Sequence, residues 1–190
     1  MTKNFMIVGV GGQGSLLASK LLGAILIDEG YDVKVSEVHG MSQRGGSVVT
    51  YVRASDKKVY SPVICEGEAD FIVSFEKLEG ARYVKCLKKG GTIVVNTQQM
   101  DPMPVITGAA VYPENVLGQL EDLGVDVQPV DALNLAVEAG TPKAANVALI
   151  GVVAKNTDIE QDVWEETIKN TVPEKFLEQN LKAFRLGYNA

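Results

Sequence analysis

Cysteine and histidine are scarce in this sequence, and their scarcity limits the chemistry that the chain can perform alone. The 190 residues contain two cysteines, Cys65 and Cys86, and one histidine, His39. Two thiols cannot supply the four ligands of an ordinary iron–sulfur cluster or structural zinc site, and one imidazole cannot form a multi-histidine site. The cysteines form no C-x-x-C pair, so we interpret them as inert thiols. The sequence therefore predicts no metal site within this chain.

Long apolar runs and long basic runs are also missing. No run approaches the roughly 20 apolar residues that span a bilayer. The first residues lead straight into a strand pattern, without the layout of a signal peptide. With 18 Lys and Arg residues against 24 Asp and Glu residues, the net charge is −6, which argues against a nucleic-acid or anionic membrane surface as the main partner. We expect a cytoplasmic protein that binds neither nucleic acid nor membrane.

The remaining composition is that of an ordinary globular protein. Hydrophobic residues make up 46% of the chain and charged residues 22%, which is not the composition of a disordered chain. A chain of this length fits one domain, and no internal repeat or low-complexity linker divides it. We expect residues 1–190 to form one domain, with a C-terminal helical portion at about 144–190.

Short apolar runs alternate with segments of helical periodicity. The run at 5–10 ends in glycines, as in a strand buried on both faces, and a helical stripe then runs from Ser15 to a stop at Gly30. The turn candidate Ser55–Lys58 indicates an inserted hairpin. Strands are expected at 5–10, 31–38, 47–54, 71–75, 92–96 and 125–130, and helices at 15–29, 77–87, 114–123, 131–138, 144–155, 161–170 and from 173 onward. The alternation predicts an α/β fold, Rossmann-like and doubly wound, with a mainly parallel sheet, an inserted β-hairpin and C-terminal helices.

Three finer features follow from the same patterns. Residues 5–38 have the length of a strand–helix–strand unit with a right-handed parallel crossover. Gly90 and Gly91 are expected to end the helix at 77–87. Two prolines in the segment 98–107 predict a loop there.

The first chemical motif is a glycine turn that follows the first strand and opens the first helix. The segment Gly9–Gly14 satisfies the pattern G-x-G-x-x-G. Its fixed glycines are Gly9, Gly11 and Gly14, and the two variable positions between the last two are Gly12 and Gln13. Glycines permit a tight turn and a close approach of the backbone to a phosphate, toward which the exposed amides point. Near the end of the second strand, Glu37 is placed to meet a ribose hydroxyl. The alternative interpretation is a tight glycine turn that binds no nucleotide.

The second motif is the polar, glycine-rich segment Ser36–Gly46. It lies at the carboxyl edge of the expected sheet, beside the glycine turn, where α/β proteins bind ligands. The guanidinium of Arg44 suits a carboxylate or phosphate, and a hydrogen-bonding or partner-contacting role is favoured for His39. The other candidate contacts of this motif are Ser42, Gln43, Gly45 and Gly46. The alternative is a solvated connection in which the glycines only turn the chain.

The residues alone thus predict a ligand- or partner-binding Rossmann-like domain. No nucleophile–base pair, paired-carboxylate spacing or P-loop spacing stands out. His39 and Arg44 are supporting candidates at a site, and no residue is predicted to be catalytic by itself.

Together with a third motif, Gly67–Glu76, the two motifs strongly resemble one family. The chain is similar over essentially its whole length to the small (beta) subunit of indolepyruvate:ferredoxin oxidoreductase, which is equivalent to the gamma domain of pyruvate and other 2-oxoacid:ferredoxin oxidoreductases. The segment Ser36–Gly46 is the most specific part of the match.

The resemblance implies a heteromeric, anaerobic enzyme. A large partner subunit would hold thiamine diphosphate, Mg and iron–sulfur clusters and would decarboxylate an aryl 2-oxoacid. Electrons would pass to ferredoxin, and coenzyme A would accept the acyl group. This chain lacks the Gly-Asp-Gly…Asn pattern that holds magnesium diphosphate in thiamine enzymes. Its own share would be to close the site, with the glycine turn and the segment His39–Gly46 facing the large subunit.

Two other functions stay open at this level. A stand-alone NAD(P)-dependent dehydrogenase would use the glycine turn and Glu37. A non-catalytic nucleotide-binding module would bind a ligand, and no activity of it would depend on a large partner. The 190 residues contain no obvious substrate domain, which disfavours the dehydrogenase more than the binding module. Among 2-oxoacids, no residue selects one substrate on physical grounds.

Overall fold

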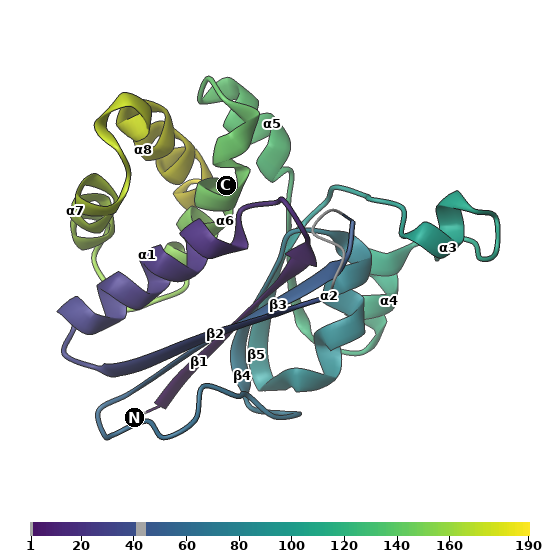
Figure 1. The fold of residues 1–190 in the computed structure, drawn as a ribbon, viewed down its shortest axis with the longest axis horizontal. Helices are drawn as coiled ribbons and strands as arrows, with labels where there is room; N and C mark the ends of the chain where they lie inside the picture. Colours follow the sequence, from purple (N-terminus) through teal and green to yellow (C-terminus); the bar gives the residue numbers. More distant parts are fainter. Residues whose placement is uncertain (1, 41–44) are drawn as a thin grey trace.

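The computed structural model describes residues 2–40 and 45–190. Within them, the strands are β1 (Thr2–Val10), β2 (Asp32–His39), β3 (Ser47–Ser55), β4 (Ala69–Ser74), β5 (Leu87–Asn96) and β6 (Asp126–Val130). They form one mixed sheet in the order β2-β3-β1-β4-β5-β6 (Figure 1). β1, β4, β5 and β6 pair in parallel, whereas β3 lies antiparallel between β1 and β2.

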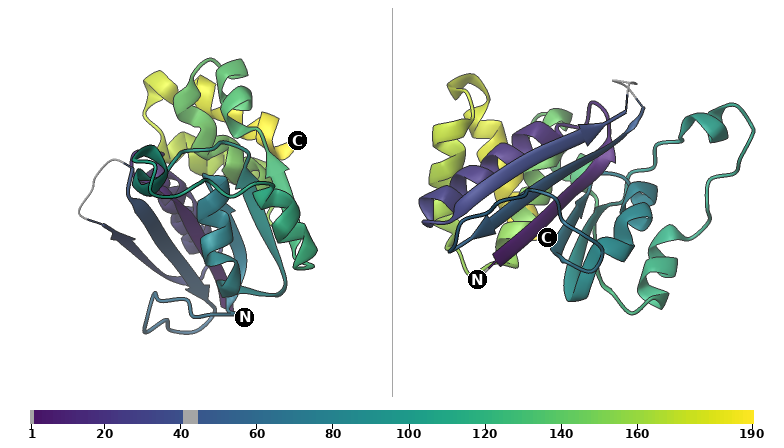
Figure 2. Two further views of the ribbon diagram at one scale, coloured as in Figure 1. Left: turned by 90° about the vertical axis from the view of Figure 1, so that its right-hand side faces the viewer. Right: turned by 60° about the horizontal axis from the view of Figure 1, so that its bottom comes forward.

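Helices cover both faces of this sheet. The helices are α1 (Ser15–Asp28), α2 (Lys77–Tyr83), α3 (Met103–Ile106), α4 (Val116–Asp122), α5 (Ala132–Glu138), α6 (Ala145–Lys155), α7 (Gln161–Thr171) and α8 (Glu174–Tyr188), with 3-10 turns η1 (Val84–Cys86) and η2 (Pro142–Ala144). α1 and α5 to α8 gather on one face, α2 and α4 on the other, and α3 stands away from both (Figures 1 and 2). No helix among the described residues is both long and apolar enough to cross a membrane.

The hydrophobic core has a part on each face of the sheet, and β1 contributes to both. Phe5 and Ile7 pack with the larger cluster under α1 and α6, whereas Met6 and Val8 pack with the cluster under α2. All four are at most 2% exposed, as expected for a central strand. Trp164 of α7 belongs to the larger cluster and is 1% exposed. The predicted α/β fold class is confirmed.

The inserted hairpin is present, but the predicted position at Ser55–Lys58 is wrong. β2 and β3 form the antiparallel hairpin, and β3 also pairs with β1, whereas residues 56–65 form no strand. The predicted parallel crossover therefore joins two strands, β1 and β2, that point the same way but are not neighbours. Every side chain of β2 is half-buried or exposed, which fits an edge strand. The apolar pattern of β3 predicted a strand correctly, but pairing partners are chosen by contacts distant in sequence.

Gly90 and Gly91 lie inside β5, so the prediction that they end a helix is wrong. α2 ends earlier, and η1 leads into β5. A Cβ on Gly91 would lie 2.9 Å from the carbonyl oxygen of Asp70 in β4. Glycine is required here because the two strands approach closely beside a register shift in the β4–β5 pairing.

The segment 98–107, predicted as loop, contains the single helical turn α3. Pro102 is its N-cap and Pro104 lies in its first turn. The first backbone N–H groups of a helix have no intrahelical acceptor, so proline costs nothing at such positions.

Candidate functional site

The glycine turn lies between two neighbouring strands whose following helices pack on opposite faces of the sheet. α1 follows β1 on one face, and α2 follows β4 on the other, so the carboxyl ends of β1 and β4 flank the crevice in which open α/β sheets bind ligands. Gln13 spans this crevice. Its side-chain oxygen accepts a hydrogen bond from Val10 N (2.8 Å), and its amide nitrogen donates to the carbonyl of Phe75 (3.0 Å). Gln13 thus ties the two central strands together.

The glycines of the turn meet distinct steric requirements. A Cβ on Gly9 would lie 2.9 Å from Cβ of Phe75, and a Cβ on Gly14 would lie 2.5 Å from Nδ2 of Asn146. Gly12 and Gly14 have φ of +98° and +89°, the left-handed region that favours glycine. Close packing and backbone conformation therefore account for three glycines of the motif.

The segment Ser36–Gly46 meets the glycine turn at its last residue. Gly11 N donates to the carbonyl of Gly46 (2.9 Å), so the connection after β2 returns beside the turn. Gly45 has φ +79°. Residues 41–44 of this motif lie outside the described residues, so the part of the predicted site residues Ser42, Gln43 and Arg44 in a site stays a prediction.

Glu37 and His39 lie on β2, away from β1. The Glu37 carboxylate accepts hydrogen bonds from the hydroxyls of Ser15 and Thr50, both at 3.0 Å. Because Glu37 pairs with Thr50 in β3, a whole strand separates it from β1. His39 is exposed, and its Nδ1 lies 3.1 Å from the carbonyl of Gly40.

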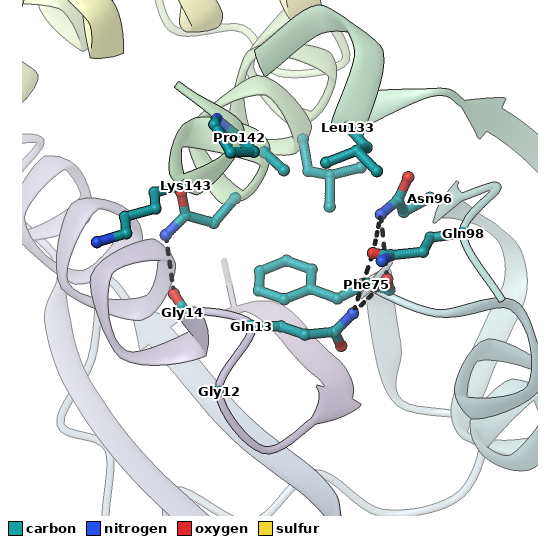
Figure 3. Close-up of a pocket in the computed structure, with 12 residues that line it drawn as sticks. Gly12, Gln13, Gly14, Phe75, Asn96, Gln98, Leu133, Pro142 and Lys143 are labelled. Carbon is teal, nitrogen blue, oxygen red and sulfur yellow. Dashed lines mark hydrogen bonds between the residues drawn. The ribbon is translucent and has the colours of Figure 1, made fainter. Parts of the chain in front are cut away.

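A pocket of about 450 Å³ opens beside the glycine turn (Figure 3). Its wall combines the turn with the ends of β4 and β5 and with α5, η2 and α6. The lining residues are Gly12, Gln13, Gly14, Phe75, Asn96, Gln98, Leu133, Pro142, Lys143, Ala145, Asn146 and Leu149. Other predicted site residues lie outside this lining, namely Gly9, Gly11, Glu37, His39, Gly45 and Gly46.

Two buried asparagines brace the pocket wall. Asn96 donates to the carbonyl of Phe75 (3.2 Å), and its side-chain oxygen accepts from Ala132 N (3.2 Å). Asn146 donates to the carbonyl of Gly14 (3.1 Å). Sequence reasoning missed both, although a signal existed: each is a polar residue inside or directly ending an apolar segment, and buried polar groups require partners.

The charge of the pocket favours an anionic or polar ligand. Lys143 is the one charged side chain among the described residues that line it, and the N-terminus of the 14-residue helix α1 opens from Gly14. No sequence signal marked Lys143. Among the described residues, no group of three or more His, Cys, Asp and Glu could hold a metal ion. The lining can bind and orient a ligand, but it contributes no nucleophile–base pair within the described part of the chain.

A buried acidic cluster lies on the other side of the crevice, where the last residue of the third motif and the residue after the second motif come together. Glu76, which ends the third motif, is 1% exposed and accepts from Glu79 N (2.9 Å) as the N-cap of α2. Ser47 directly follows the second motif, and its hydroxyl donates to Glu79 (2.6 Å). Arg82 lies 3.2 Å from the same carboxylate. Burial raises the pKa of Glu79, against the opposing effects of Ser47 and Arg82.

The fold and the site define an α/β domain whose glycine turn and largely uncharged pocket share the carboxyl edge of the sheet. The family model of pyruvate ferredoxin/flavodoxin oxidoreductases matches residues 4–190. The chain belongs to this family.

Individual relatives of the chain are also named as subunits of oxidoreductases of this kind. The chain is 43% identical to indolepyruvate oxidoreductase subunit IorB of Thermococcus kodakarensis, over 98% of this chain and 95% of that one. It is 28% identical to the pyruvate/ketoisovalerate oxidoreductases common subunit gamma of the same organism, over 95% and 92%. A solved structure, the keto/oxoacid ferredoxin oxidoreductase gamma subunit from Geobacter sulfurreducens, has the same fold, with a TM-score of 0.72 at 24% identity over 98% and 96%.

These findings confirm the resemblance drawn from the three motifs. The chain is a small, gamma-type subunit of a 2-oxoacid oxidoreductase of the indolepyruvate type, within a multi-subunit complex. Its length matches the subunits themselves, since it covers at least 92% of both curated relatives.

Proposed function

We propose that this chain supports the oxidative decarboxylation of indolepyruvate, or a closely related aryl pyruvate, to the acyl-CoA. The observation that carries the proposal is a contrast between two subunits of one organism. Identity is 43% to the indolepyruvate oxidoreductase subunit but 28% to the pyruvate/ketoisovalerate subunit, both over nearly the full length. Aryl pyruvates are therefore the substrate class to test first.

The redox chemistry belongs to a larger partner subunit in this proposal. That subunit would hold thiamine diphosphate, Mg and iron–sulfur clusters, and the electrons would leave to ferredoxin. This division of labour is supported by the two cysteines and one histidine of the present chain, which are too few for a cluster of its own. The complex would work in the cytoplasm, with residues 1–190 acting as one domain.

The share of this chain would be to complete the active site and to hold coenzyme A. The pocket beside the glycine turn presents Lys143 and backbone amides at the start of α1, which suit the phosphate groups of that co-substrate. The neighbouring connection would add anion contacts through Ser42, Gln43, Arg44, Gly45 and Gly46. The turn residues Gly9, Gly11, Gly12, Gln13 and Gly14 would keep the pocket wall in place.

Subunit mixing tests this function. The two purified subunits are combined anaerobically, and reduction of ferredoxin or viologen is followed with indolepyruvate, pyruvate and 2-oxoglutarate in the presence of coenzyme A. We expect turnover that requires both subunits and coenzyme A and prefers indolepyruvate. Full turnover by this chain alone, or a preference for pyruvate, would contradict the proposal.

Arg44→Ala tests the contact to the co-substrate. The variant is expected to assemble normally and to raise the KM for coenzyme A about tenfold, as for a lost charge-assisted contact. Lys89→Ala is the matched control, because it removes one exposed positive charge near the start of β5, at the opposite edge of the sheet. Unchanged kinetics for Arg44→Ala with coenzyme A and oxoacid would remove Arg44 from the site.

A further inference from the structure

A projecting segment carries apolar side chains that the rest of the chain does not cover. Residues 99–111, which we call the α3 arm, extend away from the body beyond α4 (Figures 1 and 2). Met103 is 62% exposed, Ile106 65% and Val111 87%, and α3 contains no buried residue. Exposed apolar side chains gathered on one projection are typical of a surface that another protein covers.

The arm has a defined shape even though it contributes nothing to the core. Its backbone bonds to itself: Ile106 N donates to the carbonyl of Pro102 (3.1 Å), and Ala110 N donates to that of Pro104 (2.9 Å). A segment ordered before it meets a partner loses less conformational entropy on binding. The arm is therefore preorganised for contact.

One buried carboxylate holds both ends of the arm. Oε1 of Glu76 accepts from Met100 N (3.3 Å) at one end and from the Tyr112 hydroxyl (2.5 Å) just beyond the other, while its Oε2 caps α2. Lys77 Nζ lies 5.6 Å from the centre of the Tyr112 ring. Burial and the hydrogen bond to Glu76 raise the pKa of Tyr112, so its hydroxyl stays a donor. Glu76 is thus the anchor of the arm.

The arm starts at the candidate site. Gln98 lines the pocket, and the side-chain amide of Gln13 lies 3.3 Å from the sulfur of Met100. The arm therefore projects from the edge of the sheet that a larger subunit would complete. Asp101 is the one charged residue of the arm, and residues 102–113, which include α3, contain none, so a surface complementary to α3 would be apolar and uncharged. A second copy of the chain is a poorer fit, because two chains of net charge −6 repel each other.

We infer that the α3 arm is a docking element for the larger subunit, with Met103, Ile106 and Val111 buried against an apolar recess of that subunit and Glu76 holding the arm in position. This inference rests on the proposed function, because that function supplies the partner.

Matched isoleucine variants test the arm. Ile106→Asp changes the arm, and Ile27→Asp makes the same change at a 59% exposed position on α1, at the far end of that helix from the glycine turn. Affinity for the purified larger subunit is measured for each full-length variant, with circular dichroism as a check of folding. We expect Ile106→Asp to weaken binding by about tenfold or more, as for a central apolar contact, and Ile27→Asp to change it by less than about twofold.

Different outcomes would refute the proposed function and the docking role of the arm. If the wild-type chain does not bind the larger subunit, the proposed function fails. If the wild type binds and Ile106→Asp binds equally well, or if both variants weaken binding equally, the docking role of the arm is wrong. If Ile106→Asp alters only self-association of this chain, the arm is a contact between copies, and the inference is overturned.

Tyr112→Phe tests the anchor. Loss of the hydroxyl should speed amide hydrogen exchange within the arm, at Ile106 and Ala110, and leave exchange in β1 and β4 unchanged. Affinity for the larger subunit should fall as well. Faster exchange in the arm with unchanged affinity would mean that a fixed arm is irrelevant to binding.

Discussion

Glu79 is the residue at which burial and charge conflict most clearly. Its side chain is 7% exposed but keeps only two polar partners on the described residues, Ser47 and Arg82. Desolvation penalises the charged carboxylate more than these partners favour it, so the pKa of Glu79 rises above the ordinary value of 4.5. The nearby Glu76 carboxylate acts in the same direction.

The contribution of Glu79 to the free energy of unfolding should therefore fall as the pH rises from about 4.5 through the raised pKa of Glu79. In the folded protein Glu79 holds its proton more tightly than in the unfolded chain, so its contribution is fully present below pH 4.5 and is lost as pH rises through the raised pKa. Glu79→Gln should lack this loss. Urea unfolding of both proteins between about pH 4 and 8 measures it. A stability difference between them that is constant, or that grows in favour of the wild type as pH rises, would contradict the assignment.

Gln13 shows why a motif residue can have a structural role as well as a predicted ligand role. The motif predicted that Gln13 lies in a ligand-binding turn, and it does line the pocket. Its hydrogen bonds to Val10 and Phe75 across the crevice could not be predicted, because the second partner is 62 positions away.

At the scale of elements, α6 and α8 pack in unusually close contact. A Cβ on Gly151 of α6 would overlap the carbonyl oxygen of Phe184, and a Cβ on Gly187 of α8 would overlap that of Ala148. The two helices can approach this closely only because both positions lack a side chain. Sequence periodicity predicted the helices of this C-terminal portion. It did not predict the contact between their glycines.

A pair of glycine substitutions tests the contact. Gly187→Ala forces α6 and α8 apart and should destabilise the fold by roughly 3 kcal/mol. Gly23→Ala in α1 is the control, because its Cβ would lie 3.6 Å from Val35, an ordinary contact. There alanine should stabilise by about 0.5–1 kcal/mol through its helix propensity. Denaturant midpoints measure both changes, and a neutral Gly187→Ala would show that the helices can separate without cost.

At the scale of the whole molecule, strand order separates this fold from a dinucleotide-binding enzyme. The strand beside β1 is the antiparallel β3, so Glu37 on β2 lies two strand spacings from β1, about 9–10 Å, instead of one. Its carboxylate already accepts two hydroxyl hydrogen bonds. Gly46 accepts a hydrogen bond from Gly11 N of the glycine turn. In a dinucleotide-binding sheet, the parallel neighbour of β1 ends at this place instead.

The isolated chain should therefore not bind NADH. A site with a Kd of about 10 µM would add roughly 2.7 kcal/mol of stability at about 1 mM ligand, which a thermal shift detects readily. We expect no shift with NADH or NADPH. A saturable shift that disappears in Glu37→Ala would restore the dehydrogenase interpretation.

The sequence by itself determined the local elements and the family. Apolar periodicity and glycine stops depend on residues close in the chain, so the central strand at 5–10, the helix after the glycine turn and the three motifs could be recognised directly. Tertiary structure alone decided the insertion of β3 between β1 and β2, the bracing of Gly14 by Asn146 across 132 positions, and the anchoring of the α3 arm on Glu76. These features depend on which distant segments pack together, and hydrophobic patterns specify that a surface is buried without specifying its partner.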